Sequence, residues 1–357
     1  MMALSKVQSQ SSKFMVCHGA IKLYSYQQNQ LSWRDIINFV QKNVSLPKNL
    51  PNASVLEEAN PKITKINPLK PKAMDYKKVF ETMVSETAQY LIKNGLKSMI
   101  LGLSGGIDST VTAAICHEVV KRYPEQQFKF IGVSLPCSSN SAEENDSASL
   151  SMKAFCTEYW VENLQKEYLL VKATCEQRYP STPVSQGNIK ARLRMIYLYN
   201  LASVTGGLVM DTDNLTEHYL GFWTIHGDVA DYNPIGGLWK HEVYELCKYL
   251  FTEVHPDENC PCHQALRAGY DITPTDGNAV APGGDMAQIA PGHTYEEVDD
   301  ILCTYLQHGD NEQEMKRLND AYGAETVERV LTRHRKSEFK RKRMPLVIER
   351  SLYDTCE

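Results

Sequence analysis

The segment Ser104–Ser109, with the sequence SGGIDS, combines residue types that bind a phosphate group at a suitable spacing. Its two adjacent glycines allow the backbone to approach a ligand closely, and the amides that begin a following helix would point at an anion. Its serine hydroxyls add donors, and Asp108 places a carboxylate where a cation bound to phosphate needs one. The chain contains no GxxxxGK sequence, so this is not a Walker loop. A glycine pair alone would suit an ordinary strand–turn–helix connection.

A second set of polar residues follows the apolar run 207–211 (GLVMD). Thr212, Asp213, Asn214 and Glu217 come directly after it, and a glycine-rich stretch carrying Asp228 and Asp231 leads to Lys240 at the start of a helix. The carboxylates could hold a cation or ammonium, and the lysine could reach a phosphate. A plain surface loop is the alternative, although long loops inside compact α/β domains are usually functional.

Two further segments carry basic residues. The helix expected at 187–205 places Asn188 and Arg192 four residues apart on one face, although most basic helix faces are simply solvated. The segment 329–343 carries eight lysines and arginines. Nucleic-acid binding is one interpretation of that segment, and we favour a C-terminal lid that brings positive charge to a polyphosphate because the whole chain is acidic.

These residues must be positioned by an α/β fold, because strand-like and helix-like patterns alternate along the chain. Strands are expected at 98–103, 128–135, 159–164 and 207–211, and helices at 75–94, from 109 onward, 141–156, 169–178 and 187–205. The alternation predicts a doubly wound, mainly parallel sheet with helices on both faces. Ligands of such sheets bind at the carboxyl ends of the strands, where the first two polar sets fall.

Composition excludes several classes of protein. The 357 residues are 42% hydrophobic and 23% charged, with a net charge of −5, which argues against a nucleic-acid-binding protein as a whole. No apolar run approaches the ~20 residues of a membrane span, and no signal-peptide pattern begins the chain, so we expect a cytoplasmic protein. Ten cysteines indicate reduced thiols. Those at Cys260 and Cys262, near His255 and His263, are interpreted as loop thiols because they lack the C-x₂-C spacing of zinc sites.

The domain boundaries follow from proline content. Residues 1–73 are expected to form an N-terminal extension, with one helix near 32–40 and a proline-rich linker, whose role the sequence does not indicate. Residues 74–350 are expected to form the main domain, with the basic lid at its end.

The order of the motifs SGGIDS, QGNIKARLRM, DTDNLTEHYLGFWTIHGDVADYNP, LWK and SEFKR resembles the ammonia-dependent NAD synthetase family, over residues 75–350. The loop itself resembles that of the N-type ATP pyrophosphatases. The resemblance implies that a carboxylate of deamido-NAD attacks the α-phosphate of ATP, and that ammonia then attacks the NAD-adenylate to release AMP. It further implies Mg²⁺, ATP as co-substrate and a homodimer. The glutamine-using form carries a glutaminase domain for which seventy residues are too few, so we expect ammonia as the nitrogen source.

The resemblance also implies individual roles, carried over position by position. For ATP binding the matching residues are Ser104, Gly105, Gly106, Ile107, Asp108, Ser109, Arg192, Thr212, Lys240 and Thr275. For deamido-NAD they are Tyr90, which would reach into a partner's site, Asn188, Phe222, Asp228, Asp231, Asp285 and Lys340. Asp108 and Glu217 match magnesium ligands, and the catalytic roles fall to Asp108, Lys240 and Asp228.

Departures from the family pattern leave alternatives open. Ser134 stands where the family has a basic residue, Asp211 where it has glycine, and Phe339 where its lid has histidine. One alternative is another adenylating amidotransferase or thiolase with the same loop. The other is a catalytically silent protein that binds nucleotide or RNA.

Overall fold

The computed structural model describes residues 74–137, 141–273 and 284–342, which lie in a unit spanning residues 68–357. The expected N-terminal extension and linker, residues 1–73, lie outside these ranges, and so does Thr275. The domain boundary at residue 73 therefore stays a prediction. Within the described ranges, every helix is too short or too polar to span a bilayer.

The described residues form a parallel sheet of strands in the order β3-β2-β1-β4. Their bounds are Ser98–Gly102 for β1, Lys129–Ser134 for β2, Glu158–Val161 for β3 and Leu208–Val209 for β4. Strand β4 is shorter than the predicted 207–211 because the chain then turns to a loop, where the amide of Asp211 donates to the carbonyl of Tyr232 at 2.9 Å. The predicted mainly parallel sheet is confirmed.

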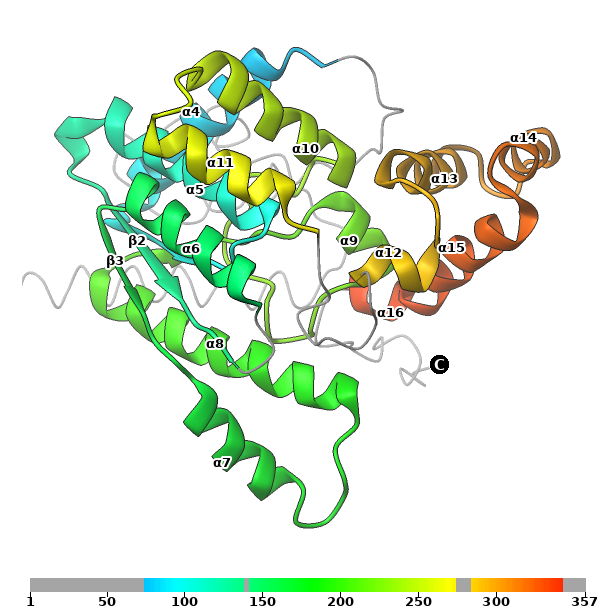
Figure 1. Cartoon of the computed structure of the whole chain (residues 1–357), viewed down its shortest axis with the longest axis horizontal. Coiled ribbons are helices and arrows are strands. Elements are labelled where there is room, and N and C mark those ends of the chain that lie inside the picture. Colours follow the sequence, from blue (N-terminus) through cyan, green and yellow to red (C-terminus); the bar gives the residue numbers. More distant parts are fainter. Residues whose placement is uncertain (1–73, 138–140, 274–283, 343–357) are drawn as a thin grey trace, which may run out of the picture. The chain divides into compact units, whose positions relative to one another are not determined.

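Helices cover both faces of this sheet (Figure 1). One face packs on α4 (Tyr76–Asn94), α5 (Ile107–Arg122), α6 (Ala142–Phe155), α10 (Lys240–Tyr249) and α11 (Pro261–Asp271), and the other on α7 (Gln165–Cys175) and α8 (Pro183–Thr205). Successive side chains of a strand point to opposite faces of the sheet, so neighbouring residues of β1 belong to different cores. Met99 and Leu101 join the first core, whereas Ile100 joins the second.

A third core lies among the later helices, beside the sheet's carboxyl edge. It joins α9 (Leu215–Leu220), α12 (Gly284–Ile289), α13 (Tyr295–His308), α14 (Glu312–Tyr322) and α15 (Ala324–Lys336), with the short α16 (Glu338–Arg341) after them. Trp239 packs into this core directly before α10 begins. The core therefore fixes where α9 and α10 start.

Several helix starts differ from the prediction because capping residues decide them. Helix α8 begins at Pro183 rather than 187, since Thr182 and Ser185 form a reciprocal capping box and proline suits the first helical position. Helix α5 begins at Ile107 rather than 109, directly after the glycine pair. The amides of this first turn therefore belong to the motif itself.

The first glycine of the motif is required by both conformation and space. Gly105 has a φ of +89°, and a Cβ built there would lie 2.0 Å from the carbonyl oxygen of Glu144. The turn packs directly on α6, where the Ser147 hydroxyl donates to the Gly105 carbonyl at 2.7 Å. No other residue fits this backbone without moving α6.

We expect Gly105→Ala to lower the free energy of unfolding by about 1–3 kcal/mol, because a positive φ and a clash with backbone both oppose the new methyl group. Urea denaturation followed by circular dichroism measures this change. Gly237→Ala is the matched control, since no atom lies within 4 Å of its Cβ position. Equal unfolding midpoints for the two variants would contradict the assignment.

Candidate functional site

The motif Ser104–Ser109 forms a turn between β1 and the first turn of α5. The amide of Gly106 donates to the Ser104 hydroxyl at 3.3 Å, and the Ser109 hydroxyl donates to the Gly106 carbonyl at 3.0 Å. Gly106 is the N-cap of α5 and provides no side chain to occupy the first amides of the helix. The turn therefore presents backbone donors and the positive end of a sixteen-residue helix to an anion.

A buried lysine joins this turn to two other helices. Lys240, the first residue of α10, is 2% exposed. Its Nζ donates to the Asp108 carboxylate and, at 3.3 Å, to Oε1 of Glu217 on α9. Asn214, the N-cap of α9, completes the cluster by donating to Oδ1 of Asp108 at 2.9 Å. One ammonium group thus lies between two carboxylates beside the phosphate-binding turn.

The charges of this cluster keep the lysine protonated. Burial alone would lower the pKa of Lys240, but the charges of Asp108 and Glu217 outweigh it and raise the pKa well above its ordinary value. The ammonium ion also lies 5.7 Å from the centre of the Tyr295 ring. A fixed positive charge at this position suits the binding of a polyphosphate.

Further carboxylates lie close to the cluster. Desolvation and the charges of Asp211 and Glu217 raise the pKa of Asp213 well above its usual range, and desolvation also raises the pKa values of Asp211 and Asp228. Asp211, the departure from the family pattern, accepts hydrogen bonds from the amides of Asp213 at 2.9 Å and Ala230 at 3.1 Å. It therefore braces the loop that carries Asp228.

A cavity of about 500 Å³ opens beside these groups. The residues that both sequence and structure place around it are Ser104, Gly106, Ile107, Asp108, Ser109, Asn188, Thr212, Glu217, Phe222, Asp228, Lys240 and Lys340. They come from the carboxyl ends of β1 and β4, from α8, and from the helices of the third core. The predicted convergence of distant segments at this edge of the sheet is therefore observed.

Four residues expected at the site do not line the cavity: Gly105, Arg192, Tyr90 and Asp231. Gly105 shapes the turn through its positive φ and packs on α6. Arg192 donates to the carbonyl of Ile225 at 3.0 Å and so holds the loop before Asp228. Tyr90 stacks on Tyr232, with ring centres 4.7 Å apart.

The carboxylate of Asp231 binds groups of the fold. Oδ2 accepts from the Val209 amide at 3.0 Å and Oδ1 from the Tyr199 hydroxyl at 3.1 Å. Asp231 thereby fastens the loop to β4 and does not line the cavity, so its role as a substrate contact stays a prediction. Thr275 and the side chain of Asp285 lie outside the described residues.

The cavity also includes residues that the sequence did not indicate. They include Arg194, Trp223 and Thr224. Arg194 stands two residues beyond Arg192, on another side of α8, and its Nε donates to the Leu135 carbonyl at 3.0 Å. The helical pattern alone did not indicate which side of α8 faces the ligand.

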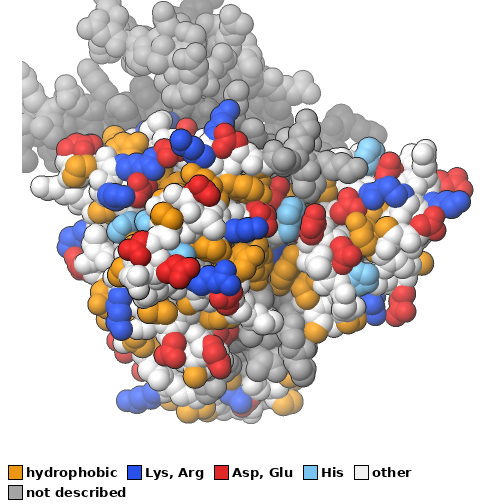
Figure 2. Space-filling view, turned by 45° about the horizontal axis from the view of Figure 1, so that its top comes forward, with side chains coloured by type: hydrophobic (Ala, Val, Ile, Leu, Met, Phe, Trp, Pro, Cys, Tyr) orange, Lys and Arg blue, Asp and Glu red, His pale blue; other side chains and the backbone are white. Residues whose placement is uncertain are grey.

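The basic C-terminal segment divides into two groups. Arg333 and Lys340 line the cavity, and Lys340 donates to the carbonyls of Gly221, at 2.6 Å, and Trp223. Arg329, Arg335 and Lys342 instead pair with glutamates of α15 and α16. Figure 2 shows basic and acidic side chains interspersed on one face of the molecule. Part of the predicted lid therefore supplies positive charge to the cavity.

A second buried network holds the lysine helix in place. The Thr216 hydroxyl accepts from the Lys240 amide at 2.9 Å and donates to Asp299 of α13. Asp299 also binds the amide of His241 at 3.1 Å and its Nδ1 at 2.8 Å. Burial would lower the pKa of His241, but its bond to Asp299 outweighs this effect and raises the pKa.

The raised pKa predicts a pH-dependent contribution to stability. A histidine whose pKa is raised by folding stabilises fully below its unfolded pKa of about 6.5 and loses that stabilisation as the pH rises through its folded value. We therefore expect the free energy of unfolding of the wild type to exceed that of His241→Gln most at pH 6, and the difference to shrink progressively towards pH 9. Urea denaturation of both proteins across this range measures the difference. A difference that grows with pH would contradict the pairing.

Comparisons with known proteins agree with this geometry. The family model described as NAD synthase matches residues 79–345. The chain is 29% identical to the NH(3)-dependent NAD(+) synthetase of Wolinella succinogenes over 265 residues, which cover 74% of this chain and 93% of that protein. It is 36% identical to the enzyme of the same name from Campylobacter jejuni subsp. doylei over 179 residues, covering 50% and 69%.

A solved structure extends the comparison to the fold. The NMN synthetase of Francisella tularensis aligns with a TM-score of 0.60 and 27% sequence identity, covering 77% of this chain and 98% of that one. The matched residues include the phosphate-binding turn, the lysine cluster and the whole lined cavity. From the match over residues 79–345, we conclude that this chain belongs to the NAD synthase family.

Proposed function

We propose that this chain is an ammonia-dependent NAD synthetase, a ligase that forms a carbon–nitrogen bond. The carboxylate of deamido-NAD attacks the α-phosphate of ATP, and pyrophosphate leaves. Ammonia then attacks the acyl carbon of the NAD-adenylate, AMP leaves, and one proton is accepted. The curated relatives from Wolinella and Campylobacter carry this name, and the alternatives of a thiolase or a silent nucleotide-binding protein find no support among them.

One observation carries the proposal: the buried ammonium of Lys240 lies between Asp108 and Glu217, directly beside the phosphate-binding turn. A fixed cation and preorganised backbone donors stabilise negative charge as it moves between phosphate oxygens. The first amides of α5 and the hydroxyls of Ser104 and Ser109 bind the triphosphate. The protein thereby favours departure of pyrophosphate without forming a covalent bond to the substrate.

The carboxylates of Asp108 and Glu217 fit Mg²⁺, because both offer hard oxygen ligands at the edge of the cavity and converge on one cation already. We propose that they hold Mg²⁺ with the phosphates of ATP. Bound there, the ion would neutralise charge on the triphosphate. The carboxyl group of Asp213 lies near the same position, but desolvation and the neighbouring carboxylates raise its pKa and so disfavour its charged form.

Asp228 is proposed to orient ammonium and accept its proton. Its Oδ1 accepts from the Thr224 amide, and the Thr224 hydroxyl donates to Oδ1 of Asn188 at 2.9 Å. This chain of bonds fixes the carboxylate against α8. Because desolvation raises its pKa, the group is a better proton acceptor than an ordinary aspartate.

The dinucleotide is proposed to bind along Asn188, Phe222 and Lys340, with Arg333 stacked 4.5 Å from the centre of the Phe222 ring. The homodimer, in which Tyr90 would contact the partner's substrate, and the cytoplasmic location remain predictions. The Francisella protein is an NMN synthetase. The same amidation applied to nicotinic acid mononucleotide would give NMN, so this mononucleotide is a second candidate substrate.

We expect the purified chain, given ATP, Mg²⁺ and deamido-NAD, to form NAD with ammonium but not with glutamine. NAD is measured by a coupled dehydrogenase and pyrophosphate in parallel. A higher kcat/KM for deamido-NAD than for nicotinic acid mononucleotide supports the dinucleotide. The reverse order would identify an NMN synthetase, and pyrophosphate without either product would assign a different acceptor.

Asp228→Asn should lower NAD formation by about 10²–10⁴-fold, because a proton acceptor contributes on that order, while pyrophosphate release falls less. Asp231→Asn is the matched control from the same loop, since its carboxylate binds the Val209 amide and the Tyr199 hydroxyl and does not itself line the cavity. Both variants are first compared with wild type by circular dichroism. Unchanged turnover in Asp228→Asn would remove the proposed role.

A further inference from the structure

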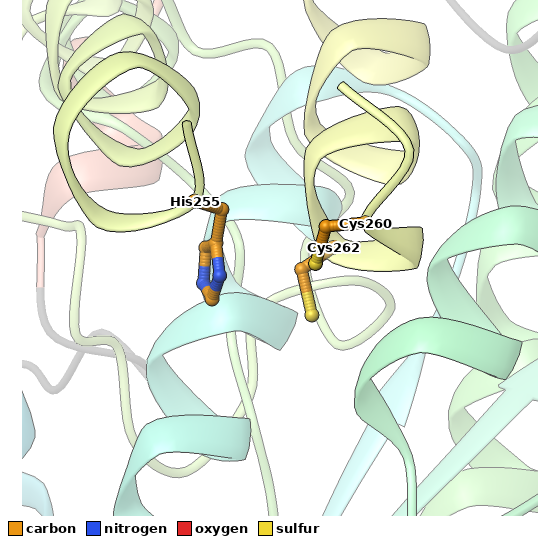
Figure 3. Close-up of side chains that lie close together, drawn as sticks. All are labelled: His255, Cys260 and Cys262. Atoms are coloured by element: carbon orange, nitrogen blue, oxygen red, sulfur yellow. The ribbon is translucent and has the colours of Figure 1, made fainter. Parts of the chain in front are cut away.

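Three metal-binding side chains converge at the junction of two helices outside the cavity. His255 follows the π-helix η2 (Leu250–Val254), Cys260 is the N-cap of α11, and Cys262 lies in its first turn. One ligand atom from each residue lies within 4.8 Å of the others (Figure 3). None of the three lines the catalytic cavity. We propose that His255, Cys260 and Cys262 form a binding site for Zn²⁺.

The backbone that carries these residues is already held in position. The His255 amide donates to the Leu250 carbonyl at 2.9 Å, and the Cys260 amide donates to the Asp257 carbonyl at 2.9 Å. Nδ1 of His263 bonds the His255 carbonyl at 2.8 Å and thereby ties α11 to the end of η2. The loop is therefore preorganised, so little further chain entropy opposes metal binding.

The side chains themselves remain available to a metal. Among the described residues, the His255 imidazole has no hydrogen-bond partner. The Cys262 thiol interacts with the thiol of Cys260, a fellow member of the site, and lies 3.9 Å from the Ala154 carbonyl. All three side chains are half-buried, so an ion can enter from solvent.

The donor set selects the metal. Two thiolates and one imidazole are ligands that Zn²⁺ takes in tetrahedral sites, whereas Mg²⁺ and Ca²⁺ prefer oxygen. Zinc bond lengths of about 2.3 Å to sulfur and 2.0 Å to nitrogen place such donors about 3.5–3.8 Å apart. Closing from 4.8 Å requires side-chain movement of about 1 Å. Solvent occupies the fourth position, and the ion cross-links η2 to α11.

The sequence spacing H-x₄-C-x-C did not indicate this site, because it lacks the C-x₂-C pair of common zinc sites. Folding supplies the missing ligand: the π-helical turn ends so that His255 faces the start of α11. The competing interpretation is a pair of loop thiols, free or joined in a disulfide. The two interpretations differ in whether the histidine and both sulfurs bind one ion together.

The test uses the full chain, reduced and purified without a metal-affinity column. After incubation with zinc sulfate and gel filtration, elemental mass spectrometry should find about one zinc ion per chain, because the three ligands bind one ion together. Titration with Co²⁺ should give thiolate-to-cobalt charge-transfer absorption and the visible bands of tetrahedral coordination. Circular dichroism verifies that each protein is folded.

We expect Cys260→Ser, Cys262→Ser and His255→Ala each to weaken zinc binding by more than ~10-fold, since even ligand-supporting residues contribute about 10–100-fold. Cys175→Ser is the matched control, because this exposed thiol lies on α7. If the wild type and the Cys260→Ser/Cys262→Ser double variant bound zinc equally well, the proposed site would be overturned. Undiminished binding by His255→Ala would also overturn it. These readouts do not depend on NAD formation.

Discussion

The structure of the site depends on one buried ion pair, in which the ammonium of Lys240 meets the carboxylates of Asp108 and Glu217. An unpaired charge at this depth would cost several kcal/mol, so folding must bring both carboxylates to the lysine. The three residues begin three different helices, and the pair therefore fixes the relative positions of α5, α9 and α10. A phosphate-binding turn and a cation are held side by side as a consequence.

Around this pair, polar side chains either support the backbone or face the ligand. Asp211 and Asp231 are used by the fold, because each accepts backbone amides and fastens the loop after β4. Asp228 is carried by the same loop and faces the cavity. The bonds of Asp211 and Asp231 hold this glycine-rich loop in place and thereby position Asp228, the proposed proton acceptor. Family membership agrees with this arrangement, since the matched residues 79–345 contain all of it.

The basic side chains are likewise divided between the cavity and the rest of the fold. The chain is acidic as a whole, yet Lys240, Arg333 and Lys340 place positive charge around one cavity. Arg329, Arg335 and Lys342 instead pair with nearby glutamates, which offsets their charge. The proposed zinc site lies outside this cavity and concerns the packing of α11, so zinc there would serve a different purpose from the Mg²⁺ proposed at Asp108 and Glu217.

The local features of this protein could be predicted from sequence. The glycine pair of Ser104–Ser109 and the alternation of strands with helices are short-range patterns, and they indicated the turn and the parallel sheet correctly. The side of a helix that faces the cavity could not be predicted from such short-range patterns. Arg192 and Arg194 differ by about 200° around α8, and only packing against the sheet decides which of them faces the cavity. Asp231 and His255 show the same limit, because their partners, at Val209 and at the start of α11, are chosen by tertiary contacts that spacing along the chain does not encode.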